Sequence, residues 1–184
     1  MLSKNQMLTQ IAKRNFSALN YRVAGNPQVY LRVASGDQVL GDMVFELYAD
    51  KVQGLSESFA ALCEGSEGVS LKGNAFHKGM SGLGIFAGHL NDEENRSAFD
   101  MRLPDEDLQM RHHKRGMISM VNDGENSNGS EFMITFNEAR FLDGYQVICG
   151  ELVEGDAVLA KLEEACDRHG NVEGDVRIVD AGCK

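Results

Sequence analysis

The chain has 184 residues, which is enough for one domain with a short appendage and too few for two comfortable domains. Its formal net charge is −10, and the part after position 36 carries 13 basic and 28 acidic side chains. A body this acidic repels phosphate backbones, which argues against nucleic acid as a direct ligand. The same charge suits either a basic partner surface or solubility alone. Apolar runs are only a few residues long, so the sequence predicts no membrane-spanning segment.

Residues 1–25 differ from the rest because they contain no acidic side chain. They are basic and rich in hydroxyl groups, and their apolar residues recur at a spacing that places them on one helical face: Leu8, Ile11, Ala12, Phe16 and Leu19. This composition is typical of a mitochondrial transit peptide and predicts delivery to the matrix or a matrix-facing site. A disordered basic tail is the alternative. We therefore divide the chain into a leader, 1–25, and a domain, 26–184.

The domain begins after Asn26-Pro27 with patterns that favour short strands. Apolar residues alternate over 29–33, a turn follows at 35–37, and 43–48 is a second strand pattern. Leu55, Phe59 and Leu62 predict a helix that Gly65 ends. Strands are expected over 117–121, 132–136 and 146–153, then a helix around 158–162 and a last strand over 176–179. Many short strands with two helices favour a barrel or a sandwich.

The sequence predicts no cofactor and no metal site. The four cysteines, at 63, 149, 166 and 183, form no disulfide framework and are expected to be inert, mostly buried thiols in a reducing compartment. His112 and His113 are adjacent and lack a third ligand placed to complete a metal site. The glycine spacing of 124–129 resembles a phosphate-binding loop, but Ser130-Glu131 follows it where a lysine is required.

Several sequence blocks occur in an informative order. They are Phe76-His77-Lys78, then 119–122 (SMVN), 128–132 (NGSEF) and 141–144 (FLDG), preceded by 41–47 (GDMVFEL). In this combination and spacing the chain resembles the cyclophilin family over about residues 27–183. The resemblance implies an all-β-dominated fold, a closed eight-stranded antiparallel barrel capped by two helices near 54–63 and 155–166. It also implies that X-Pro peptides bind on the outside of the barrel, where their cis/trans isomerisation is catalysed.

The residues of the implied site depart from the family pattern. Lys78 stands where the family carries its catalytic arginine, and Gly84 stands where it carries a methionine of the proline pocket. The resemblance assigns substrate binding to Phe76, Leu83, Phe86, Asn122, Glu131, Met133, Phe141, Leu142 and Gln146. Of these, Leu83 and Met133 replace pocket phenylalanines, Phe86 and Glu131 replace glutamines, Phe141 replaces tryptophan, and Gln146 replaces histidine. Asn122 and Leu142 match the family.

These departures predict a weakened site. Lysine keeps the charge of arginine but loses the planar fork that fixes its aim. Smaller side chains remove part of the apolar wall, although Met133 can refill some of it. Glu131 would neutralise Lys78 if the two were close. The alternatives are that Met133 and Phe86 are core residues, that Lys78 is a solvated surface charge, and that Asn122 only forms a turn.

Three functions follow from the sequence. The chain is a slow isomerase that uses Lys78, a binder that grips an extended segment without turnover, or a fixed subunit of a large mitochondrial assembly. We interpret it as a cyclophilin-like protein with a degenerate site, acting as a structural or peptide-binding subunit among protein partners. The alternative is an active prolyl isomerase that assists protein folding.

Overall fold

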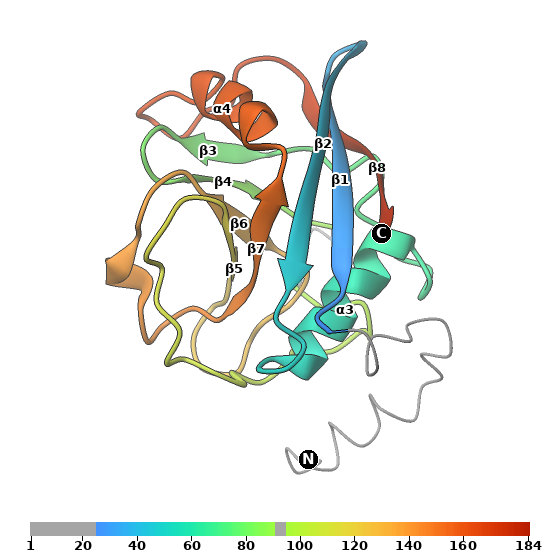
Figure 1. Cartoon of the computed structure of the whole chain (residues 1–184), viewed down its shortest axis with the longest axis vertical. Coiled ribbons are helices and arrows are strands. Elements are labelled where there is room, and N and C mark those ends of the chain that lie inside the picture. Colours follow the sequence, from blue (N-terminus) through green and yellow to red (C-terminus); the bar gives the residue numbers. More distant parts are fainter. Residues whose placement is uncertain (1–24, 91–94) are drawn as a thin grey trace.

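The computed structural model describes residues 25–90 and 95–184 (Figure 1). The expected leader therefore lies outside the described residues except for Gly25. Eight strands and two α-helices follow one another in an order close to the predicted one. They are β1 (Gln28–Ser35), β2 (Gln38–Leu47), α3 (Gln53–Glu64), β3 (Lys78–Met80), β4 (Gly84–Ala87), β5 (Met117–Met120), β6 (Phe132–Thr135), the 3-10 turn Arg140–Leu142, β7 (Ile148–Glu154), α4 (Asp156–Glu164) and β8 (Val176–Cys183).

The eight strands form one antiparallel sheet in the order β3-β4-β6-β5-β7-β2-β1-β8. The sheet curls strongly, so that α3 lies across one end of the curl and α4 lies at the other (Figure 1). A fully closed barrel is too strong a description. At the seam, the segment before β3 meets β8 through the isolated bridge Ala75↔Arg177 and a few backbone hydrogen bonds, such as that from the amide of Phe76 to the carbonyl of Val176, 2.9 Å.

The core fills the inside of the curl. In β1, Val29, Leu31 and Val33 are fully buried and alternate with outward-facing residues, as the strand period requires. Phe59 of α3 meets Phe132 of β6 edge to face, with ring centroids 4.9 Å apart. Each large apolar side chain buried in this way contributes about 1.5–3 kcal/mol to folding.

Helix α3 is capped at its C-terminus by a residue next to it in sequence and at its N-terminus by a distant one. Gly65 ends it with a left-handed backbone, φ 73°, as predicted. At its start, Val52 offers no capping side chain, and the carboxylate of Glu106 accepts hydrogen bonds from the amides of Gly54 and Leu55, at 3.0 and 2.9 Å. A carboxylate there satisfies free amides and interacts favourably with the helix dipole.

The predicted helices and strands are confirmed, with two additions. Strands β3 and β4 were not foreseen as strands, because they are only three and four residues long and contain glycine. Neither helix within residues 25–90 and 95–184 has the length and apolar character needed to cross a bilayer.

Candidate functional site

Four neighbouring strands carry the candidate site on their outer face. Lys78 of β3 pairs with Phe86 of β4, Phe86 with Met133 of β6, and Met133 with Ser119 of β5. Paired residues of antiparallel strands project from the same face of a sheet. The next row along consists of Gly79, Ile85, Ile134 and Ile118, which are buried against the core. The row from Lys78 to Ser119 therefore faces outward, and we call it the outer row.

Lys78 is exposed, and its ammonium group lies over the ring of Phe86. The distance from Nζ to the ring centroid is 5.2 Å, within the range of a cation–π contact. At an exposed position such a contact is worth about 0.5–1 kcal/mol. Lys78, which replaces the family arginine, therefore contacts Phe86, which replaces the family glutamine. The positive charge of Lys78 is present, and its ammonium group rests on the face of the Phe86 ring.

Met133 fills the part of the outer row where an apolar pocket was expected. Its side chain is only 1% exposed. A Cβ atom added to Gly84 would lie 2.8 Å from Met133 Cγ and 2.9 Å from its Sδ, closer than real contacts allow. The glycine at 84 and the methionine at 133 are therefore a matched pair, in which Met133 occupies the space above Gly84. Leu83 beside them is partly buried.

Glu131 makes its main contact with His77. Its Oε1 lies 3.1 Å from His77 Nε2, and its Oε2 lies 4.0 Å from His89 Nδ1. The hydrogen bond from His77 is the largest influence on the carboxyl group and lowers the pKa of Glu131, although partial burial opposes this. Lys78 also lowers the pKa of Glu131, with the smallest effect among the groups that act on it. The effect of Lys78 on Glu131 is therefore secondary to the pair with His77.

The side chain of Asn95 hydrogen-bonds to the backbone at Glu131 and fixes its position. Its Oδ1 accepts the amides of Ser130 and Glu131, at 2.8 and 2.9 Å, and its Nδ2 donates to the carbonyl of Val121. A Cβ on Gly129 would lie 2.2 Å from that Oδ1, so only glycine allows this approach. The contribution of Asn95 was missed in the sequence, because 35 and 36 residues separate it from the two amides that it binds.

The other end of the outer row is formed by the turn that contains Phe141, Leu142 and Gln146. Phe141 is 66% exposed and the nearby Tyr145 is 74% exposed, whereas Leu142 is partly buried. Asn122 ties this turn to β5 because its Nδ2 donates to the carbonyl of Tyr145, 2.8 Å. Its Oδ1 also accepts the amide of Gly124, 3.4 Å, so a turn-forming role is part of what Asn122 does.

A buried polar chain lies behind Gln146. His112 Nδ1 is 2.9 Å from Asp143 Oδ1, His112 Nε2 is 2.8 Å from Ser119 Oγ, and Ser119 Oγ is 2.8 Å from Gln146 Oε1. His112 and Ser119 are both 0% exposed. Burial is the largest influence on His112 and lowers its pKa, although Asp143 opposes this. His113, by contrast, is exposed and contacts the carbonyl of Arg111.

The structure thus brings most of the predicted site residues to one outer face. Lys78, Phe86, Met133 and Gln146 lie on or beside the outer row, and Glu131 adjoins it. Phe76 lies in the core, 4% exposed, and supports β3 from inside. His77, His89 and His112 were not among the predicted site residues. Within the described part of the chain, no cluster of three or more histidine, cysteine or acidic side chains is arranged to hold a metal.

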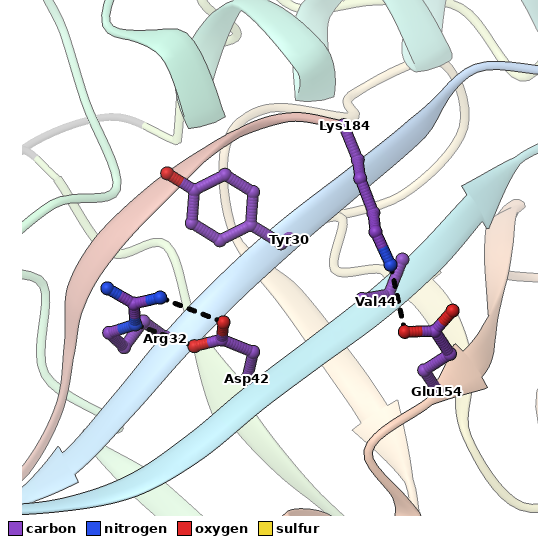
Figure 2. Close-up of a pocket in the computed structure, with 6 residues that line it drawn as sticks. All are labelled: Tyr30, Arg32, Asp42, Val44, Glu154 and Lys184. Carbon is purple, nitrogen blue, oxygen red and sulfur yellow. Dashed lines mark hydrogen bonds and ion pairs between the residues drawn. The ribbon is translucent and has the colours of Figure 1, made fainter.

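A second recess lies on the other half of the sheet, around β1 and β2 (Figure 2). This pocket of about 210 Å³ is lined by Tyr30, Arg32, Asp42, Val44, Glu154 and Lys184. Arg32 forms a two-bond pair with Asp42, at 2.7 and 2.9 Å, and Lys184 pairs with Glu154 at 2.8 Å. Each charge that lines the pocket is thus already balanced by a neighbour.

A family model corroborates the fold. The model for the cyclophilin type peptidyl-prolyl cis-trans isomerase/CLD family matches residues 30–183, which include β1 from Tyr30 onward and all of β2 to β8. The antiparallel sheet and the two helices agree with that match. The chain therefore belongs to the cyclophilin-type peptidyl-prolyl cis-trans isomerase family.

Proposed function

We propose that this cyclophilin-family chain binds extended X-Pro segments of a partner protein and isomerises them far more slowly than an intact family site would. The observation that carries the proposal is the arrangement of Lys78, Phe86 and Met133 in the outer row. The ammonium group rests on an aromatic ring, and the space for a proline ring above Gly84 is taken by a buried methionine.

The chemistry of isomerisation explains why this arrangement slows turnover. Rotation about the peptide bond has a barrier of about 18–20 kcal/mol, which falls when a donor hydrogen-bonds the prolyl nitrogen as the amide twists. The donor helps only if its bond is stronger in the twisted state than in the planar one. Lys78 must leave the Phe86 ring to act, and a misplacement of about 1 Å can reduce a rate by about a hundredfold.

The test is an isomerisation assay on a short X-Pro peptide. We expect low turnover by the natural chain and a gain of at least about tenfold in the variant Lys78→Arg/Phe86→Gln/Met133→Phe, because the three changes restore donor, orientation and enclosure together. Lys78→Arg alone is the matched control and should gain less. Turnover at ordinary family rates by the natural chain, abolished in Lys78→Ala, would show instead that Lys78 is a working catalyst.

An active isomerase is the second candidate, and one observation favours it. Lys78 is exposed and carries the positive charge at the position of the family arginine. A cation–π contact worth about 0.5–1 kcal/mol is weak enough to be broken by a bound peptide. Phe86→Gln separates the two candidates, because removal of the ring raises turnover if the contact restrains Lys78 and lowers it if Phe86 seats the peptide.

We also propose that the protein acts in mitochondria, matrix-facing, as a structural or peptide-binding subunit of an assembly. The basic, acid-free composition of residues 1–25 supports the location, and the acidic body after it supports a basic partner surface. A reporter fused to residues 1–25 should enter mitochondria. A diffuse cytosolic signal would contradict the location, and failure to co-purify at fixed stoichiometry with a mitochondrial complex would contradict the subunit role.

A further inference from the structure

In the polar chain behind Gln146, the number of protons available for hydrogen bonds depends on the protonation state of His112. Four groups are linked in series: Asp143, His112, Ser119 and Gln146. Asp143 receives both the backbone amide and Nδ1 of His112 on its Oδ1, at 2.8 and 2.9 Å, and its pKa is lowered, so it is an acceptor only. His112 must therefore carry a proton on Nδ1.

The remaining link depends on a single hydroxyl proton. A serine hydroxyl donates one hydrogen bond, and a neutral imidazole already protonated on Nδ1 can only accept at Nε2. If Ser119 donates to His112 Nε2, it has none left for Gln146, and the amide must turn its NH₂ toward Ser119. If Ser119 donates to Gln146 Oε1, as in the arrangement described, then His112 Nε2 must donate to Ser119 and His112 carries two protons.

We infer that the protonation state of His112, transmitted through Ser119, determines which end of the Gln146 amide faces the peptide-binding surface. With neutral His112, the carbonyl Oε1 points outward and accepts an N–H group from a bound segment. With His112 protonated, the NH₂ group points outward and donates to a carbonyl. His112, Ser119 and Asp143 are thus positioning residues, and Gln146 is the residue that contacts the segment.

The surroundings favour the neutral state near neutral pH. His112 is completely buried, and burial lowers its pKa more than Asp143 raises it. Asp143 is the ionised group in contact with His112, and Arg111 acts in turn on Asp143. On the β5 side and toward Gln146, the groups that face His112 are uncharged. We therefore place the carbonyl of Gln146 outward at neutral pH, ready to accept a backbone amide. This turns the side-chain amide by half a rotation from the described arrangement, in which Oε1 faces Ser119.

The direct test is nitrogen NMR of the full chain without peptide at pH 7. We expect the His112 ring to be protonated on Nδ1 alone and the Gln146 side-chain NH₂ to exchange with solvent several-fold more slowly than in Ser119→Ala. In that variant the Nδ1 proton should remain, because Asp143 still holds it. A proton on Nε2 alone, or equal exchange of the Gln146 amide in both chains, would overturn the inference.

A second variant measures the coupling in the opposite direction. Gln146→Glu supplies a group that only accepts, so Ser119 must donate to it and His112 Nε2 must donate to Ser119. The pKa of His112, followed by the same spectra, should rise in this variant and return in Gln146→Glu/Ser119→Ala. A His112 titration that Gln146→Glu leaves unchanged would contradict the relay, and a merely structural role of Ser119 would not produce the reversal.

The consequence for peptide binding rests on the proposed function and is measured separately. At pH 7, Gln146→Met removes the outward acceptor and should weaken binding of an X-Pro peptide by about three- to tenfold, the worth of one hydrogen bond, and more than Gln146→Glu does. Equal affinities in these two variants would contradict the outward carbonyl. If the natural chain binds no X-Pro peptide, the proposed function fails, while the spectra of the free protein still decide the relay.

Discussion

The two halves of the curled sheet handle their polar groups in opposite ways. Around β1 and β2, charges are matched in exposed pairs, such as Arg32 with Asp42 (Figure 2). Around β5 and β6, buried polar groups share partners: Ser119, which is fully buried, contacts both His112 and Gln146. Exposed pairs contribute little and tolerate change, whereas buried shared networks are costly to disturb. The second half therefore combines the candidate site with the tighter constraints.

The largest expected difference between the halves concerns glycine. A Cβ on Gly88, beside β4, would lie 2.1 Å from the carbonyl oxygen of Ser130, and its φ of +87° is already strained for other residues. Gly88→Ala should lower the free energy of unfolding by about 2–4 kcal/mol. Gly36, in the turn between β1 and β2, has φ +56° with nothing within 4 Å and is the matched control.

Gly36→Ala should lower the free energy of unfolding by about 1 kcal/mol, from backbone strain alone. Urea unfolding of the three chains measures both effects. Equal losses in the two variants would show that the halves are equally tolerant and would break the comparison.

An intermediate effect is expected at Glu131. The hydrogen bond from His77 lowers the pKa of this carboxyl group, so its ionised form is more favourable in the folded chain than in the unfolded one. Its contribution is fully present above the unfolded pKa of about 4.3 and is lost as pH falls through the lower folded value. Glu131→Gln should therefore lower the free energy of unfolding by about 1 kcal/mol at pH 7.

The difference between the natural chain and Glu131→Gln should shrink steadily below pH 4.5, where the unfolded carboxyl begins to bind protons. Unfolding curves in urea from pH 3 to pH 7 measure it. A difference that stays constant over this range would assign the loss to packing rather than to the ionised carboxylate.

The smallest effect is expected in the exposed half. A double-mutant cycle of Arg32→Met and Asp42→Asn should give a coupling of about 0.2–1 kcal/mol, because both side chains are more than a third exposed. Salt should reduce it, since the Debye length falls to about 3 Å at 1 M. A coupling above about 2 kcal/mol that resists salt would show that the two-bond geometry of Arg32 outweighs its exposure.

Sequence patterns predicted the helices and strands that are long enough to show a regular side-chain period. The alternation around Leu31 identified β1, and the spacing of Leu55 and Phe59 identified α3, because side-chain period alone determines which face is buried. Strands β3 and β4 are too short to show a period, so their residues were found only through the family resemblance.

The residues of the candidate site were predicted from the sequence, but the hydrogen bonds that connect them were not. For Glu131 the sequence offered only a conditional role, the neutralisation of Lys78 if the two were close. Its principal partner is His77, the residue just before that lysine. In the sequence, His112 was considered only together with His113, as a pair that lacks a third metal ligand. Its burial depends on Asp143, 31 residues away, and on Ser119 in β5, which local patterns do not reveal.

The capping of α3 by Glu106 has a consequence for the order in which the chain folds. The two amides that it binds precede it by 52 and 51 residues, and α3 also packs against β8, which is translated later still. During synthesis the helix therefore emerges well before either of these partners. The amides of its first turn have to be satisfied by water until Glu106 arrives. Its apolar face stays exposed until β8 packs against it. Contacts so distant in sequence slow folding, because long loops must close before these contacts form.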